Sequence, residues 1–148
     1  MPPLFPGPAY RILTNRTQIR CWEPADAPRL LAAVTKNQDH LRPWMPWAAG
    51  ELPTLEDEIS LLRHFRGQFE LGNDFTYAIF DRTGEKVIGG TGLHTRPGKQ
   101  AREIGYWIDQ DCINQGYATE ISAALTRVAF EVDAVLRVEI WCAAENVR

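Results

Sequence analysis

The sequence contains few cysteines, and their spacing fits neither a disulfide framework nor a metal site. Cys21, Cys112 and Cys142 are an odd number, with no Cys-x-x-Cys pair and no zinc-type Cys/His spacing. We therefore expect no disulfide framework and no structural zinc, and a reducing cytoplasm is the expected compartment. Cys112 lies beside the most informative motif and is a candidate nucleophile. Since no histidine lies near it in sequence, we favour a small buried or loop side chain.

The sequence also lacks a large excess of one charge and a long apolar run. A net charge of -3 is too small to favour nucleic acid or an anionic membrane as the main partner. No apolar run approaches the roughly 20 residues that a membrane span needs. The first residues, MPPLFPGPAY, lack the cationic start and apolar core of a signal peptide, so we expect none.

What the sequence does contain is typical of one globular domain. It has 148 residues, of which 45% are hydrophobic and 24% charged, a size and composition at which a chain buries a sizeable core. We predict a single domain over residues 1–148, with no internal repeat. Strand-type and helix-type patterns alternate along the chain, which predicts an α/β or α+β fold.

Hydrophobic periodicity and turn residues place the expected elements. Strands are expected at residues 10–13, 18–22, 75–80, 87–93, 102–108 and 137–142. A first helix is expected to open near Pro24 and Pro28, and a second to begin at Thr54, with Asp57 completing a capping box. A third is expected over about 116–132. We expect the proline- and tryptophan-rich segment 37–47 to form a rigid loop.

The most informative stretch runs from Glu103 to Glu120. It is predicted to form a strand, a short loop and the start of a helix that contains Gly116 and Ala118. Small residues there let the backbone approach a ligand closely. The free N–H groups of a helix start, aided by the helix dipole, favour a phosphate or pyrophosphate. On this spacing alone, a phosphate site and simple packing of small residues are equally favoured.

Several segments, in order along the chain, resemble the GNAT superfamily of acetyl-CoA-dependent N-acetyltransferases, in its RimJ/RimL-like branch of ribosomal-protein acetyltransferases. EIGYWID (103–109) and NQGYATE (114–120) are similar to the family's acetyl-CoA motif. The segments 19–26, 37–47 and 87–92 agree with that branch, and VEIWCAAEN (138–146) is similar to the strand before the family's Asn-x-x-Ser signature. The resemblance runs from about residue 10 to the last residue. It implies a mixed, mostly antiparallel central sheet flanked by helices.

The resemblance also implies a binding site for acetyl-CoA, which is a co-substrate, and it implies no metal. The backbone at the end of the strand would bind the pantetheine arm, residues 114–119 would form the pyrophosphate loop, and an asparagine after the next strand would contact the cofactor arm. The implied cofactor-binding residues are Trp107, Ile108, Asn114, Gln115, Gly116, Tyr117, Ala118, Thr119 and Asn146. Ile113 stands where the superfamily prefers Arg or Gln. Because the loop acts mainly through backbone N–H groups, we expect that difference to be tolerated.

Acetyl transfer makes its own chemical demands. The acceptor amine must lose a proton before it attacks the thioester, so a base is useful, and a backbone N–H can stabilise the oxyanion that forms. Glu103 is our candidate catalytic base, because it lies on the strand that would present the thioester. A solvated carboxylate paired with Arg102 or Arg137 is an equally favoured interpretation. The alternative bases are His40, His64 and His94.

Two further features of the sequence each allow two interpretations. Trp44 and Trp47 either line the acceptor pocket or, as is more usual for loop aromatics, seal a core. The chain stops at Arg148, where family members continue with a serine, a helix and two strands. We expect either a truncated chain or an edge strand covered by a second chain, as in a homodimer.

Two function classes follow from the sequence. The first is an enzyme that transfers acetyl to a primary amine, with a protein N-terminus slightly favoured over a small molecule. The second is a non-catalytic acyl-CoA-binding or interaction module.

Overall fold

The computed structural model describes residues 7–142 and 146, which form a six-stranded sheet with the strands in sequence order. Neighbouring strands are antiparallel except for the last pair, which is parallel. The elements are β1 Arg11–Leu13, β2 Thr17–Cys21, α1 Ala27–Leu41, α2 Leu55–Glu70, β3 Phe75–Asp81, β4 Val87–His94, β5 Ala101–Ile108, α3 Tyr117–Glu131 and β6 Arg137–Ile140. The predicted mixed, mostly antiparallel sheet flanked by helices is confirmed.

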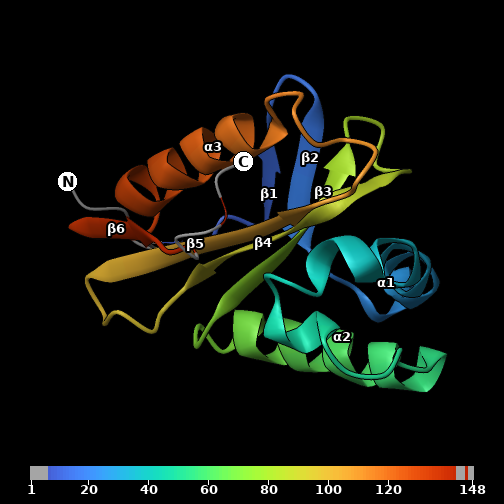
Figure 1. Ribbon diagram of the computed structural model, residues 1–148. Helices are drawn as coiled ribbons and strands as arrows, with labels where there is room; N and C mark the ends of the chain where they lie inside the picture. Colours follow the sequence, from blue (N-terminus) through green and yellow to red (C-terminus); the bar gives the residue numbers. More distant parts are fainter. Residues whose placement is uncertain (1–6, 143–145, 147–148) are drawn as a thin grey trace.

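The helices cover both faces of the sheet, with α3 on one face and α1 and α2 on the other (Figure 1). The alternation along β3 explains this arrangement, because successive side chains point to opposite faces. Tyr77 and Ile79 join the core that contains Leu125 of α3, whereas Ala78 and Phe80 join the core that contains Leu62 of α2. Because helices cover both faces, the consecutive residues 77–80 of β3 are all buried and largely apolar.

The second helix begins as the sequence predicts. The side chain of Thr54 accepts a hydrogen bond from the N–H of Asp57, and the carboxylate of Asp57 accepts one from the N–H of Thr54. This reciprocal pair satisfies two N–H groups that the helix itself leaves without partners. Among residues 7–142 and 146, no helix is both long and apolar enough to cross a membrane.

The expected loop over residues 37–47 is wrong in its first half. The helix α1 continues to Leu41, and a 3₁₀ turn at Pro46–Ala48 follows. Asn37, a poor helix former, is fully buried in α1. Its Nδ2 donates to the carbonyl oxygen of Ala33 and to the carboxylate of Asp109, which lies 72 positions further on. Tertiary hydrogen bonds therefore override a weak local preference here. The last strand is also shorter than expected, since β6 ends at Ile140 and not at residue 142.

A buried carboxylate joins the first strands to the first helix. Asp26 is 2% exposed and receives a bidentate pair from Arg20 of β2, at 2.8 and 2.9 Å. Arg29 of α1 donates to it at 2.7 Å and also holds the β3–β4 turn through the carbonyl oxygens of Gly84 and Glu85. The single charge of Asp26 thus links three parts of the chain.

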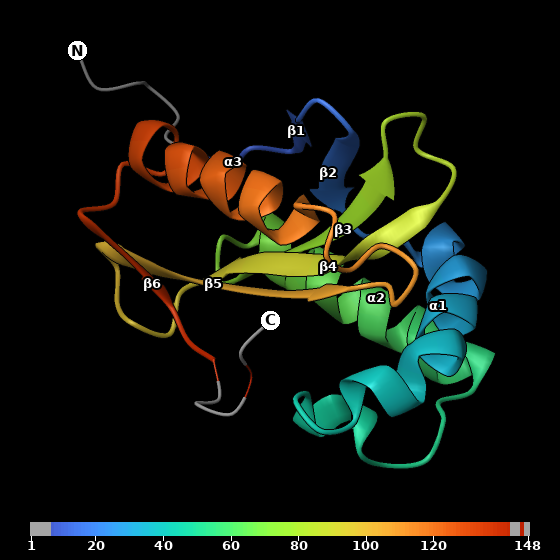
Figure 2. The same cartoon turned by 45° about the horizontal axis from the view of Figure 1, so that its top comes forward.

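The parallel pair β5 and β6 is joined only over half of β5. The register runs from Ala101 opposite Arg137 to Ile104 opposite Ile140. Beyond this pair the ribbons of the two strands diverge (Figure 2). The second half of β5 therefore has a free edge toward the side of β6, within the part of the chain that the structure describes.

Candidate active site

The loop between β5 and α3 is anchored by the first helix. Asp109, which directly follows β5, is buried and accepts hydrogen bonds from Nζ of Lys36 at 3.0 Å and from Nδ2 of Asn37 at 3.0 Å. Asn37 also accepts a hydrogen bond from the N–H of Gln110. Burial acts to raise the pKa of Asp109, but these hydrogen bonds outweigh it and hold the pKa below its usual value. The loop therefore leaves the sheet in a fixed direction.

The start of α3 presents free backbone N–H groups. The first intrahelical hydrogen bond runs from the N–H of Glu120 to the carbonyl oxygen of Gly116. The N–H groups of Tyr117, Ala118 and Thr119 therefore have no acceptor within the helix. Gly116 precedes them with φ +82°, a left-handed conformation that glycine adopts without strain. This is the geometry of an anion site, and it fits a pyrophosphate.

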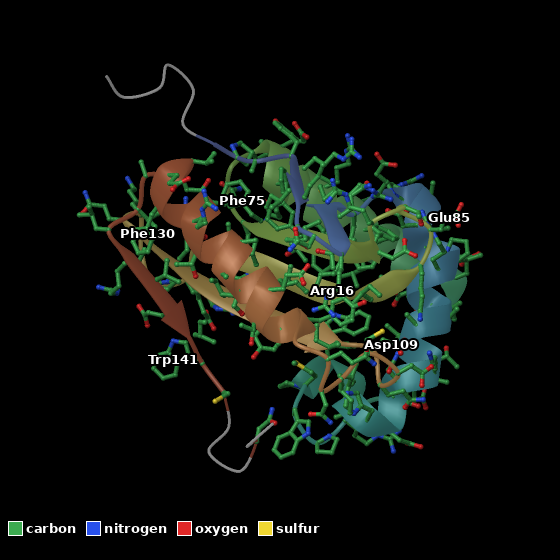
Figure 3. The ribbon with its side chains drawn as sticks, turned by 90° about the horizontal axis from the view of Figure 1, so that it is seen from above. Arg16, Phe75, Glu85, Asp109, Phe130 and Trp141 are labelled. Carbon is green, nitrogen blue, oxygen red and sulfur yellow. The ribbon has the colours of Figure 1, made fainter. Side chains whose placement is uncertain are left out.

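A basic side chain from the opposite end of the chain lies against this helix start. The guanidinium of Arg16, in the β1–β2 turn, lies 4.0 Å from the ring centroid of Tyr117. It donates to the carbonyl oxygen of Gln115 at 2.9 Å and to the carboxylate of Glu120 at 2.8 Å (Figure 3). Arg16 was not among the residues predicted from the sequence, because about 100 positions separate it from the loop and no local pattern indicates it.

Replacing Arg16 with alanine is expected to weaken acetyl-CoA binding. The substitution removes the anchor of the loop and leaves the carboxylate of Glu120 uncompensated beside the proposed phosphate site. We expect the dissociation constant to rise about fivefold, measured by calorimetric titration. The double variant Arg16→Ala/Glu120→Gln should recover part of the affinity. Equal affinity of the single variant and the wild-type protein would place the phosphates elsewhere.

The free edge of β5 supplies a second set of N–H groups. The hydroxyl of Thr91 on β4 donates to the carbonyl oxygen of Gly105 at 2.6 Å, and the N–H of Asp109 donates to Ile88 of β4 at 2.7 Å. The odd-numbered residues of β5 therefore turn their backbone groups toward β4. By the alternation of a strand, Tyr106 and Ile108 turn theirs toward the gap beside β6. Tyr106 was not among the predicted residues, although its position on the strand could have indicated it.

The predicted base, Glu103, lies on the face of β5 that is turned toward α1 and α2. Glu103 is 18% exposed in its side chain, and its Oε2 accepts a hydrogen bond from Nε of Arg96 at 2.8 Å. This partner is neither Arg102 nor Arg137. The hydrogen bond from Arg96 lowers the pKa of Glu103, outweighing the opposing effect of burial. His94 stands opposite Glu103 in the register of β4 and β5.

The other candidate residues from the sequence lie at different places in the structure. His64 lies on the exposed side of α2, and His40 lies in the last turn of α1. Cys112 is buried, and burial raises the pKa of its thiol, which disfavours a thiolate nucleophile. Asn146 is half-buried and lies outside any helix or strand.

Trp47 packs against Trp107, with the ring centroids 6.0 Å apart, and remains 51% exposed. Trp44 is also exposed, at 38%. The structure therefore places these two tryptophans at a surface beside the sheet and not in a sealed core.

A strand with a free edge, an anchored loop and an open helix start suit a ligand that has a hydrogen-bonding arm and a pyrophosphate. Coenzyme A has both parts, so this geometry fits the class of coenzyme A-dependent acyltransferases. Comparisons with known proteins are more specific. Residues 16–148 match the family of the acetyltransferase (GNAT) domain. Over 132 residues the chain is 30% identical to YdaF of Bacillus subtilis, whose name places it with the ribosomal N-acetyltransferases, covering 86% of this chain and 69% of YdaF.

Solved structures confirm the fold. RimL, a ribosomal L7/L12 α-N-protein acetyltransferase in complex with coenzyme A, superposes with a TM-score of 0.78 at 22% identity, over 92% of this chain and 76% of that one. The ribosomal-protein-S5-alanine acetyltransferase of Vibrio fischeri gives 0.77 at 18% identity, over 94% and 77%. MccE, the microcin C7 self-immunity acetyltransferase in complex with acetyl-CoA and AMP, gives 0.78 at 16% identity, over 89% and 72%.

The chain therefore belongs to the GNAT acetyltransferase family. It is an N-acetyltransferase that uses acetyl-CoA as co-substrate and transfers the acetyl group to a primary amine. Among the described residues, no three His, Cys, Asp or Glu side chains gather closely enough to hold a metal ion.

Proposed function

We propose that the acceptor is the N-terminal α-amine of a polypeptide, which approaches from the face of the sheet that carries α1 and α2. The observation that supports this proposal is an exposed pair of tryptophans at that face. Trp47 packs against Trp107 of β5 and is 51% exposed, and Trp44 is 38% exposed. Such an apolar surface offers more contact to a peptide chain than to a small, strongly hydrated polyamine. The names of YdaF, RimL and the Vibrio fischeri enzyme give independent support.

In this proposal the residues around the start of α3 hold the cofactor. The loop 114–119 binds the pyrophosphate, chiefly through the N–H groups of Tyr117, Ala118 and Thr119. Trp107 and Ile108 end the strand that binds the pantetheine arm, and Asn146 contacts that arm. When bound, acetyl-CoA supplies the thioester whose acyl group is transferred.

The free edge of β5 also serves the reaction. The N–H of Tyr106 faces the gap beside β6, where it can stabilise negative charge that develops on the carbonyl oxygen of the thioester. A backbone donor needs no reorganisation during the reaction, which makes this stabilisation effective.

Glu103 is the residue that the sequence predicts as the catalytic base. A carboxylate on the acceptor face of β5 can attract an ammonium group and is a candidate base. Its hydrogen bond with Arg96 and its lowered pKa make proton uptake from an amine less favourable. We therefore propose that Glu103 acts chiefly by attracting the acceptor ammonium.

Thiol release with a panel of amines tests the proposed acceptor. The panel contains peptides with free N-termini, the same peptides with blocked N-termini and one internal lysine, spermidine, free amino acids and an aminoglycoside. We expect kcat/KM for a free N-terminus to exceed that for every other amine by about tenfold or more, which corresponds to about 1.4 kcal/mol of additional contact. Fragmentation mass spectrometry should place the acetyl group on the α-nitrogen.

Two outcomes would contradict the proposal. A preference for spermidine or the aminoglycoside would make the acceptor a small molecule. Saturable binding of acetyl-CoA with no thiol release from any amine would support a non-catalytic acyl-CoA-binding module.

A further inference from the structure

The face of β4 and β5 that lies toward α1 and α2 contains a row of two glycines. Gly92 and Gly105 stand opposite one another in the register, between the pairs Gly90–Trp107 and His94–Glu103. Trp107 packs with the core beneath α1 and α2, so that the alternate positions 103 and 105 of β5 share its face. Because neither glycine has a side chain, this row leaves room for a neighbouring ring.

The imidazole of His94 lies on this glycine row. A Cβ atom at Gly92 would lie 2.5 Å from both Cε1 and Nε2 of His94, and one at Gly105 would lie 3.7 Å from that Nε2. The imidazole therefore lies over β4 with its Nε2 toward Gly105, whose neighbour Tyr106 turns its N–H toward the gap beside β6. A larger residue at position 92 would displace the ring, whereas a Cβ atom at position 105 would make an ordinary contact with it.

The other nitrogen of His94 is held by a carboxylate. Its Nδ1 lies 3.0 Å from Oδ2 of Asp74, in the turn between α2 and β3. The second oxygen of Asp74 accepts a hydrogen bond from the N–H of Thr95 at 3.1 Å. Burial acts to raise the pKa of Asp74, but the hydrogen bonds from His94 and Thr95 outweigh it and hold the pKa below its usual value. An ionised Asp74 accepts a hydrogen bond from Nδ1–H, and this leaves the lone pair of neutral imidazole on Nε2, the nitrogen that lies toward Gly105.

The charged groups around His94 come from several elements. Asp74 lies on one side, and Glu103 of β5 stands opposite with its partner Arg96 from the β4–β5 turn. On β6, Glu139 stands opposite Glu103 in the register and is paired with Arg137. Two of the three carboxylates thus have their own arginine. The side chain of Asp74 instead pairs with the imidazole.

We infer that the acceptor ammonium binds beside Gly105 and that Nε2 of His94, oriented by Asp74, removes its proton, directly or through one water. This inference rests on the proposed approach of the acceptor from the α1/α2 face. The Nε2 lone pair takes one proton, and the freed nitrogen lone pair forms the C–N bond, which places negative charge on the carbonyl oxygen of the thioester. The C–S bond then breaks, the second nitrogen proton passes to the departing thiolate to give the thiol, and the imidazolium returns its own proton to solvent.

The chemistry favours imidazole over carboxylate for this step. A polypeptide α-amine has an ordinary pKa of about 7.7–8.0, whereas free imidazole is near 6.5 and a free glutamate near 4.3. Proton transfer is most efficient between groups of similar pKa. His94 is the catalytic residue in this scheme, and Asp74 is a positioning residue.

Kinetics of four variants test the assignment, with the best amine of the panel and calorimetric titration of acetyl-CoA for each. His94→Ala should lower kcat about a hundredfold and leave the dissociation constant for acetyl-CoA unchanged. Added imidazole should restore part of this activity, because the removed ring leaves its space over Gly92. The matched control His64→Ala, on the exposed side of α2, should stay within about twofold of the wild-type protein and show no rescue.

Asp74→Asn and Glu103→Gln separate the two carboxylates. Asp74→Asn should lower kcat with little change in KM, whereas Glu103→Gln should act mainly on KM. Nitrogen-15 NMR should find neutral His94 with its proton on Nδ1 in the wild-type protein and a mixture of both tautomers in Asp74→Asn.

Three outcomes would overturn the inference. They are near-normal kcat in His94→Ala, a larger loss of kcat in Glu103→Gln than in His94→Ala, and a wild-type His94 with its neutral proton on Nε2. If the amine panel does not favour a peptide N-terminus, the proposed acceptor is wrong, but that result does not decide the role of His94. A small amine preferred over peptides still permits the same comparison of variants, and the tautomer is measured without turnover.

Discussion

Gly116→Glu is expected to abolish measurable binding of acetyl-CoA. The new carboxylate would stand beside the free N–H groups of Tyr117, Ala118 and Thr119, where the cofactor's pyrophosphate is proposed to bind. It would add like-charge repulsion and bulk at the closest approach of the backbone. We expect the dissociation constant to rise at least about 100-fold, which corresponds to roughly 3 kcal/mol. Calorimetric titration with acetyl-CoA measures this directly.

Gly84→Glu is the matched control for backbone strain. Gly84 has φ +81°, against +82° for Gly116, and lies in the β3–β4 turn. Both substitutions force a non-glycine residue into the left-handed region, at a cost of about 1 kcal/mol of stability. Only Gly116→Glu should lose the cofactor. Normal binding by Gly116→Glu, with its fold intact by circular dichroism, would refute the placement of the site.

Asp26→Asn is expected to cause a large loss of stability. The substitution keeps the shape of the side chain but removes the buried negative charge that both Arg20 and Arg29 contact. Removal of one partner from a buried charge cluster typically costs about 3 kcal/mol or more, because the remaining charge is left uncompensated. Urea unfolding should show a lower midpoint with an unchanged slope.

The control for Asp26 is a carboxylate on the surface. Asp39 is 98% exposed in its side chain and lies 3.8 Å from Arg42, so Asp39→Asn should leave the urea midpoint nearly unchanged. If both variants unfold at the wild-type midpoint, Asp26 does not hold β2, α1 and the β3–β4 turn together.

The stabilisation that Asp26 provides is expected to decrease as the pH falls. Burial acts to raise the pKa of Asp26, but the hydrogen bonds from Arg20, Arg29 and the N–H of Glu23 outweigh it, and the folded-state pKa is lowered. The stabilisation is therefore complete above the unfolded pKa of about 3.9 and is lost as the pH falls through the folded value. The difference in stability between the wild-type protein and Asp26→Asn should shrink in acid.

Local signals in the sequence located most of the secondary structure. The Thr54–Asp57 capping box starts α2 where it was predicted, because that signal depends only on residues within one turn. The prediction failed where distant residues intervene. Asn37 is helical because Asp109 and Gln110 bond its side chain, and no property of segment 37–47 reveals those partners.

The sequence by itself determined the family and the cofactor class, and it supplied the prediction of the glycine loop, because these depend on motifs that are contiguous in the chain. Only the tertiary structure decided what surrounds them. It brings Arg16 to the start of α3, pairs Glu103 with Arg96, and sets His94 between Asp74 and a row of two glycines. These contacts arise from strand register and from helices that pack across the sheet. Residues far apart in sequence meet there, and periodicity within one element carries no information about that meeting.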